Sequence, residues 1–164
     1  MVIWLDFINH HIAHAASCYY SSGFQDSAII THDGFGNGFS YHSGLVLYGK
    51  HNNLYPLSPN HLSIGTLYKS VAIMLNLGGF GEGKLMGLAP YGKEKYAQKA
   101  LDLFRSTLYV DDIEFKWKIK PTDSYFWFKE RLEGVRFDNI AYALQTWVEE
   151  LILEWIDNAI NKYG

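Results

Sequence analysis

Two histidines four residues apart, His10 and His14, are the clearest indication of chemistry in this sequence. On a helix, residues four apart lie on one face with Cβ atoms roughly 5–6 Å apart, so both imidazoles could bind one metal ion. His11 would point about 100° away, because a helix turns once every 3.6 residues. Zinc proteases share the spacing but need a glutamate directly after the first histidine, the position of His11. The spacing is therefore compatible with a metal site in a protein other than a zinc protease. Taken alone, it is equally compatible with two histidines that bind no metal.

A glycine-rich turn, residues 33–38 (DGFGNG), supplies a second candidate group. Glycines let such a turn expose its backbone amides in a concavity that suits anions such as phosphate. Asp33 follows an apolar run, and an aspartate at the end of a strand can ligate a metal. An ordinary hairpin turn would explain this segment alone, but together with the histidine pair it indicates a site.

The elements that would position these residues follow from apolar runs and helical spacing. Asn9 is a plausible N-cap for the histidine helix, and Gly23 would end it. Residues 27–57 predict two β-hairpins in succession. The strands are expected at residues 2–7, 27–32, 39–47 and 53–57, and the helices at 10–21, 62–76, 93–105 and 136–163. Residues 78–92 are expected to form a glycine-dense loop with a purpose beyond connection, and 109–120 show strand-like alternation.

The last of these helices is the clearest, because its apolar residues recur at helical spacing and form a wide stripe. A helix that faces a core explains the stripe without a cofactor. The stripe consists of Phe137, Ile140, Leu144, Trp147, Val148, Leu151, Ile152, Trp155, Ile156 and Ile160.

Composition restricts the classes of function. The 164 residues are 48% hydrophobic and 19% charged, which is typical of one globular domain. The net charge of −3 without a basic run argues against nucleic acid as a partner. The single cysteine, Cys18, suits a reducing compartment, and neither a signal peptide nor a membrane helix is recognisable. We therefore expect a soluble cytoplasmic protein with no nucleic acid and no membrane as partner; it could form a homo-oligomer.

Three segments resemble the O-carbamoyltransferases of the nodulation and antibiotic type. Residues 10–24 (HHIAHAASCYYSSGF) resemble the helix motif of that family, and Asp33-Gly34 falls where the family has an Asp-Gly pair. Residues 63–68 (SIGTLY) with 83–92 (GKLMGLAPYG) are similar to its glycine-rich signature. The resemblance covers about residues 3–100. Gly83 departs from it, since a bulkier, usually aromatic residue is expected there.

The resemblance implies an α/β fold, part of an actin- or sugar-kinase-like (ribonuclease H-like) lobe with a mixed sheet, hairpins and helices. Residues 1–164 would be the central part of a transferase domain: 1–26 the metal-binding helix region, 27–92 hairpins, helix and glycine-rich loop, and 93–164 a helical region. The first lobe, a later nucleotide-binding strand, a fourth metal ligand and an adenylate-forming domain are not recognised. The resemblance therefore implies, as partners, the remaining lobe and the adenylate-forming domain of a full-length enzyme.

The resemblance also implies a site. His10, His14 and Asp33 would bind iron, although this ligand set also suits zinc or manganese. A carbamoyl-adenylate derived from ATP would bind beside the metal, which would polarise its carbonyl for attack by a hydroxyl. No catalytic residue is assigned. The predicted substrate and nucleotide residues are Gly34, Gly36, Asn37 and Gly38, which would hold the phosphate, and Glu82 and Lys84 in a substrate-side loop, although Lys84 equally fits a solvated surface lysine.

The acceptor would be a hydroxyl of a sugar, a nodulation factor or an antibiotic. Two alternatives remain. A tRNA threonylcarbamoyl transferase is a related enzyme, but residues 84–92 resemble the small-molecule branch. A non-catalytic interaction module could retain the fold without the activity.

Overall fold

The computed structural model describes residues 8–34 and 42–163, which form two compact units. The first unit comprises residues up to Ser63 together with the C-terminal residues from Ile156 onward, and the second comprises Ile64–Trp155. The strand predicted over residues 2–7 lies outside the described residues. No helix in the described ranges is both long and apolar enough to cross a membrane.

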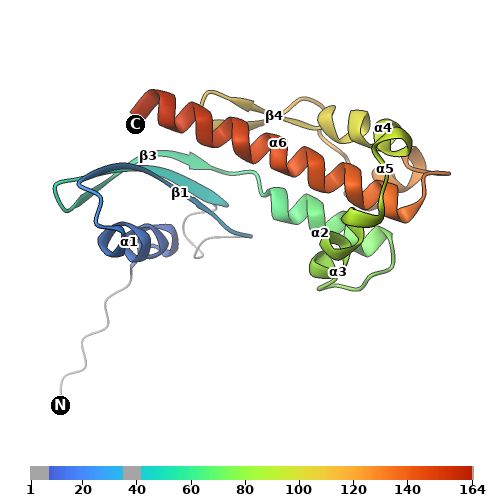
Figure 1. The fold of residues 1–164 in the computed structure, drawn as a ribbon, viewed down its shortest axis with the longest axis horizontal. Helices are drawn as coiled ribbons and strands as arrows, with labels where there is room; N and C mark the ends of the chain where they lie inside the picture. Colours follow the sequence, from blue (N-terminus) through green and yellow to red (C-terminus); the bar gives the residue numbers. More distant parts are fainter. Residues whose placement is uncertain (1–7, 35–41, 164) are drawn as a thin grey trace, which may run out of the picture. The chain divides into compact units, whose positions relative to one another are not determined.

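The first unit contains one helix and a three-stranded sheet (Figure 1). Helix α1 spans His10–Ser22, and strands β1 (Asp26–His32), β2 (Gly44–Lys50) and β3 (Asn53–Asn60) pair in that order. Both pairings are antiparallel, which confirms two successive hairpins. The described strands contain no parallel pair, which differs from the expected mixed sheet.

Helix α1 lies against one face of this sheet through a small apolar core. Ala15 and Tyr19 are buried against β1 and β2, and Tyr19 passes directly over Gly49. A Cβ at position 49 would lie 2.5 Å from the Tyr19 ring, so a larger residue there would push the helix off the sheet. The core residues are Ala15, Tyr19, Ile29, Leu45 and Leu47, with Ile12 and Leu54 packed against them.

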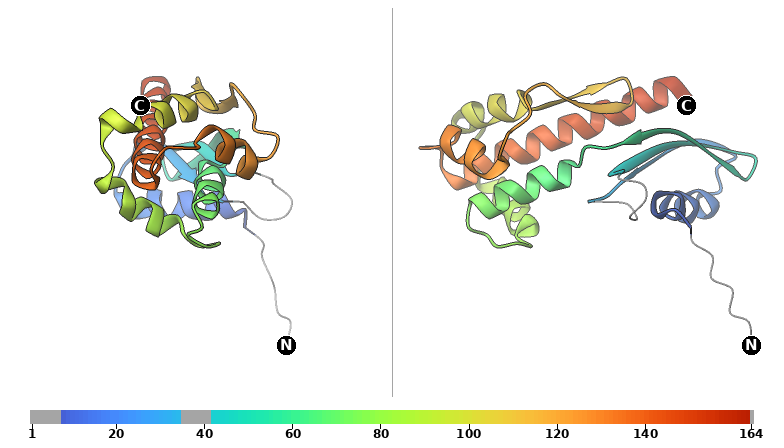
Figure 2. Two further views of the ribbon diagram at one scale, coloured as in Figure 1. Left: turned by 90° about the vertical axis from the view of Figure 1, so that its right-hand side faces the viewer. Right: turned by 180° about the vertical axis from the view of Figure 1, so that it is seen from behind.

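The second unit is mainly helical (Figure 2). Its elements are α2 (Ile64–Met74), α3 (Glu82–Leu88), the 3-10 helix η1 (Ala89–Tyr91), α4 (Glu94–Arg105), β4 (Leu108–Asp111), β5 (Glu114–Trp117), α5 (Ser124–Arg131) and α6 (Phe137–Tyr163), the last of which continues into the C-terminal residues of the first unit. Strands β4 and β5 form a separate antiparallel hairpin.

The expected loop over residues 78–92 is wrong for residues 82–91, which form α3 and η1. Leu85 and Ala89, four residues apart, are both buried and hold this segment in helical form. Gly83 and Gly87 meet open space, so their lower helix propensity is the only cost that they add. Helix α5 was not anticipated either; it begins after Asp123, whose side chain accepts a hydrogen bond from the Phe126 amide.

The core of the second unit forms around α6. Phe104 of α4 stacks on Trp147, with ring centroids 5.7 Å apart, and Phe115 of β5 contacts Trp155. The Trp155 indole donates a hydrogen bond to the Ile113 carbonyl at 2.8 Å. Half of the predicted α6 stripe is buried and two further residues are half-buried, whereas Phe137, Ile152 and Ile160 are exposed. The helix therefore buries a narrower stripe than its sequence suggests.

Candidate metal centre

The start of α1 is fixed by Asn9, as its sequence indicates. The Asn9 side chain accepts hydrogen bonds from the backbone amides of His11 and Ile12, at 3.0 and 3.2 Å. These bonds satisfy amides that the first helical turn would otherwise leave unpaired. Because the cap sets where the helix begins, it also sets the direction in which His10 and His14 project.

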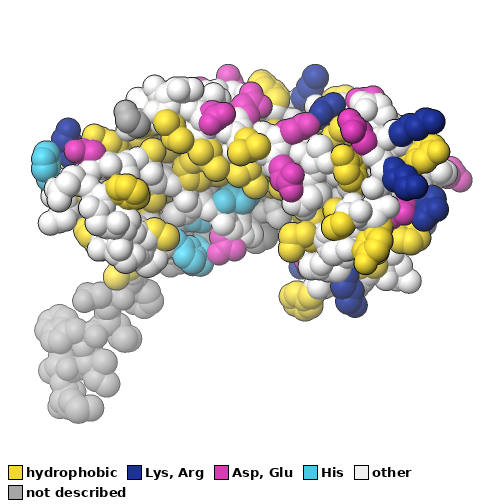
Figure 3. Space-filling model, in the orientation of Figure 1, with side chains coloured by type: hydrophobic (Ala, Val, Ile, Leu, Met, Phe, Trp, Pro, Cys, Tyr) yellow, Lys and Arg dark blue, Asp and Glu magenta, His cyan; other side chains and the backbone are white. Residues whose placement is uncertain are grey.

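His10, His14 and Asp33 meet at one point of the first unit. Nε2 of His10 lies 2.8 Å from Oδ2 of Asp33 and 3.1 Å from Nε2 of His14. Nε2 of His14 lies 3.6 Å from the same carboxylate oxygen. Figure 3 shows histidine side chains beside an acidic side chain on the surface of this unit. The three side chains are 34–53% exposed, so the point is accessible from solvent.

Asp33 is held where β1 ends. Its backbone amide donates to the Ser43 carbonyl at 2.7 Å, and its Oδ1 accepts from the Gly34 amide at 2.6 Å. The hydrogen bond from His10, followed by that from Gly34, lowers the pKa of the Asp33 carboxyl. The carboxylate is therefore ionised at neutral pH, as a metal ligand must be.

His11 has a structural place instead. It is fully buried, its Nε2 donates to the His42 carbonyl at 3.0 Å, and its Nδ1 lies 3.1 Å from the Thr31 hydroxyl. The expectation that His11 points away from the other two histidines is confirmed. His11 thereby anchors α1 to the sheet, and this anchor fixes the position of the helix that carries His10 and His14.

The three donor atoms fit one divalent cation. Ligand atoms 2.0–2.2 Å from a metal and about 90–110° apart would be separated by about 2.8–3.6 Å. The observed separations of 2.8, 3.1 and 3.6 Å match this range. Within residues 8–34 and 42–163, no other group of three such side chains converges in this way. Two imidazoles and one carboxylate suit non-haem iron and also zinc, and they leave coordination positions open.

The predicted substrate- and nucleotide-binding residues do not all belong to the unit that carries the histidines. The Gly34 amide is already used by Asp33, so any phosphate cradle in this turn depends on the amides of Gly36, Asn37 and Gly38, which lie outside the described residues. Glu82 and Lys84 belong to the second unit, in α3. Two residues along a helix differ by about 200°, so they project from opposite sides; Glu82 is half-buried and Lys84 exposed.

A second histidine pair was not anticipated. Nδ1 of His42 lies 3.3 Å from Nδ1 of His61, although the two are 19 residues apart. They meet because antiparallel pairing places the start of β2 beside the end of β3, at the same end of the sheet. Burial, then the neighbouring His61 and His11, lowers the pKa of His42. No local sequence pattern signals such a pair, since it depends on strand pairing alone.

Comparison with known proteins connects this geometry to one family. A family model described as the carbamoyltransferase N-terminus matches residues 3–164. The chain is 42% identical over 90 residues to nodulation protein NolNO of Sinorhizobium fredii, covering 54% of this chain and 13% of that protein. It is 39% identical over 98 residues to nodulation protein NolO of Bradyrhizobium diazoefficiens, covering 56% and 17%. An uncharacterised Methanocaldococcus jannaschii protein is 26% identical over 178 residues, covering 94% and 28%. The chain thus spans less than one third of each of these relatives.

Proposed function

Because the chain belongs to the carbamoyltransferase family, whose N-terminal model matches residues 3–164, we propose that it carries the metal-binding site of a carbamoyl transfer enzyme. The donor would be carbamoyl-adenylate, and the acceptor a hydroxyl of a small molecule such as a sugar, a nodulation factor or an antibiotic. The observation that carries this proposal is the convergence of His10, His14 and Asp33 on one point.

In the proposed reaction, the acceptor hydroxyl oxygen attacks the carbamoyl carbon and forms a new C–O bond. The bond between that carbon and the phosphate oxygen breaks, and AMP leaves with the electron pair. The hydroxyl proton passes to a base, which the described residues do not identify. The products are the carbamate ester and AMP, and no oxidant or reductant is needed.

The chain contributes a preorganised set of ligands. Asn9 fixes the direction of both exposed histidines, and the Gly34 amide donates to Oδ1 of Asp33, so that Oδ2 faces the histidines. His10, His14 and Asp33 would hold a divalent metal, iron being our first choice. Such a metal supplies Lewis-acid polarisation of the carbamoyl carbonyl. Gly36, Asn37 and Gly38 are proposed to hold the adenylate phosphate, and Glu82 and Lys84 to contact the substrate.

A small-molecule acceptor is favoured over tRNA by two observations. Two relatives are named as nodulation proteins, and the chain carries 17 acidic against 14 basic residues. A nucleic-acid substrate usually requires a basic surface. The remaining lobe and an adenylate-forming domain are proposed as partners that complete the site.

The proposal is tested by ligand binding under anaerobic conditions. The chain is titrated with Fe(II), and a non-hydrolysable carbamoyl-adenylate analogue is then added in a calorimeter. We expect the analogue to bind at least tenfold more tightly to the iron-loaded chain than to the chelated one, and His10→Ala to abolish that difference. Iron binding with no effect on the analogue would favour the non-catalytic module. No iron binding at all would refute the metal site.

A further inference from the structure

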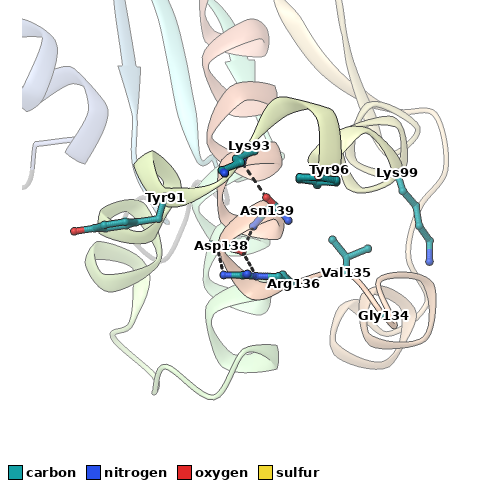
Figure 4. Close-up of a pocket in the computed structure, with 9 residues that line it drawn as sticks. All are labelled: Tyr91, Lys93, Tyr96, Lys99, Gly134, Val135, Arg136, Asp138 and Asn139. Atoms are coloured by element: carbon teal, nitrogen blue, oxygen red, sulfur yellow. Dashed lines mark hydrogen bonds and ion pairs between the residues drawn. The ribbon is translucent and has the colours of Figure 1, made fainter.

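The second unit contains a pocket of about 640 Å³ that the site described above does not use. Its volume is in the range of small-molecule sites, roughly 300–1,000 Å³. The pocket lies between the beginnings of α4 and α6 (Figure 4). It is lined by Tyr91, Lys93, Tyr96 and Lys99 on one side and by residues 134–136, Asp138 and Asn139 on the other.

Gly92 brings the two walls of the pocket together. A Cβ at this position would lie 2.4 Å from Cβ of Tyr142 and 2.5 Å from the Asp138 carbonyl oxygen, so only glycine permits the approach. The next residue, Lys93, then donates its backbone amide to Oδ1 of Asn139 at 2.9 Å. The wall that carries the lysines is therefore fixed directly to the first turn of α6.

Asn139 leaves one strong donor unused. Its side chain is only 6% exposed, and its Oδ1 is occupied by the Lys93 amide. No described residue accepts a hydrogen bond from its Nδ2, and Figure 4 shows the amide between Lys93 and Tyr96. Among the buried side-chain nitrogen and oxygen atoms of the described residues, only Trp147 Nε1 lacks a partner, so Nδ2 of Asn139 keeps contact with solvent. This donor is therefore open to an acceptor atom of a ligand in the pocket.

The charge of the pocket points to the same kind of ligand. Lys93, Lys99 and Arg136 line it against a single carboxylate, Asp138, although acidic residues outnumber basic ones in the whole chain. Arg136 forms a two-pronged ion pair with Asp138, at 2.8 and 3.2 Å, which leaves both lysine charges without a carboxylate partner within the described residues. Lys99 donates to the Glu133 carbonyl, and that bond does not neutralise it.

Two helices also begin at the pocket. Lys93 is the N-cap of the 12-residue α4, and Asp138 and Asn139 lie in the first turn of the 27-residue α6. Helix N-termini favour anions through their unpaired amides and their dipole. Tyr96, 59% exposed, adds a flat ring face at the mouth of the pocket.

We propose that this pocket binds a small phosphate monoester, with its phosphate between Lys93, Lys99 and the Nδ2 amide of Asn139. The Tyr96 ring then contacts the organic part of the ligand. The site lies wholly within Ile64–Trp155, and it does not depend on the metal or on carbamoyl transfer.

The test uses ribose 5-phosphate and AMP as probes, with ribose and adenosine as their uncharged counterparts. Binding to the 164-residue chain is followed by two-dimensional NMR, which reports affinity and location together. We expect saturable shifts at residues 91–99 and 134–139 with both phosphate esters, and at least tenfold weaker binding of ribose and adenosine. If adenosine binds as tightly as AMP, the pocket recognises the base and the proposal is wrong.

Two variants test whether the two lysines and the Asn139 amide bind the phosphate. Lys93→Gln with Lys99→Gln removes both charges, and each lost charge-assisted hydrogen bond should weaken binding about tenfold. Asn139→Asp keeps the acceptor for the Lys93 amide but replaces Nδ2 by a carboxylate oxygen, which repels phosphate. The matched control, Lys118→Gln with Lys120→Gln, removes two exposed charges from the same unit and should leave affinity unchanged. Equal weakening by the control, or no saturable shift at about 20 mM ester, overturns the proposal.

Discussion

Nε2 of His10 lies 3.1 Å from Nε2 of His14, and the same His10 atom lies 2.8 Å from the Asp33 carboxylate. Without a metal, the proton on His10 Nε2 occupies this point and donates to Asp33. A metal must displace that proton, because an imidazole binds metal only through an unprotonated nitrogen.

The first prediction concerns metal retention. His14→Ala removes one of three donors and should weaken Fe(II) or Zn(II) binding at least tenfold, measured by competition with a chromophoric chelator. His51→Asn is the matched control. It removes an exposed histidine in the β2–β3 turn, where φ is 46° and asparagine is tolerated. Equal affinity in wild type and His14→Ala would remove His14 from the ligand set.

His11 should matter for stability instead of metal binding. His11→Ala empties a fully buried position, removes the donor to the His42 carbonyl and leaves the Thr31 hydroxyl with only its bond to the Leu45 carbonyl. We expect the free energy of unfolding to fall by about 2–4 kcal/mol. His14→Ala on the same helix, measured in chelator, should change it by about 0.5 kcal/mol or less. Urea denaturation followed by circular dichroism compares the two, and similar losses would contradict the assignment of His11 as the anchor of α1.

Two buried tryptophans of α6 offer a matched test of a hydrogen bond. Trp147 and Trp155 are each 1% exposed, but only Trp155 donates its indole N–H within the described residues. Trp155→Phe should therefore lower the free energy of unfolding by about 1 kcal/mol more than Trp147→Phe does. Chemical denaturation of the two variants measures the difference. A larger loss for Trp147→Phe would mean that packing, and not the bond to Ile113, distinguishes the two positions.

The His42–His61 pair predicts a pH effect. Burial, followed by His61 and His11, lowers the pKa of His42 in the folded chain. The unfolded chain therefore takes up this proton at a higher pH, so His42 contributes stability at high pH that is lost as the pH falls through the folded pKa. His61→Gln should raise the pKa of His42, measured by NMR titration, yet leave it below the ordinary value because burial remains. An unchanged pKa would show that His61 has no influence.

Local signals in the sequence predict the elements that position the candidate metal ligands. Asn9 predicts the start of α1, the four-residue spacing predicts the common direction of His10 and His14, and both hairpins follow from apolar alternation. Contacts formed only by the tertiary fold were not predictable in this way. The His42–His61 pair and the approach of Lys93 to Asn139 join residues 19 and 46 positions apart, and no spacing rule covers them.

Helical structure in the glycine-rich segment was missed for a related reason. Gly83 and Gly87 indicate a loop by propensity, but burial of Leu85 and Ala89 on one face outweighs that preference. In α5, the run of aromatic residues obscured the helical pattern, and the cap by Asp123 was the signal that could have revealed it.

The last prediction is that the 164-residue chain binds metal but shows no detectable carbamoyl transfer. The described residues bring three donor atoms together, and the side chains of His14 and Asp33 are about half exposed. Transfer requires the carbamoyl carbon and the acceptor hydroxyl to be held in near-attack geometry, and a site this open restrains neither of them. Each 1.36 kcal/mol added to the activation free energy by poor positioning lowers the rate about tenfold, so a few kcal/mol lower it more than a hundredfold.

The measurement is release of AMP from carbamoyl-adenylate with iron and a broad set of hydroxyl acceptors, with His10→Ala in parallel. Iron-dependent release of AMP together with a carbamate ester, lost in His10→Ala, would show that this chain alone holds a complete site.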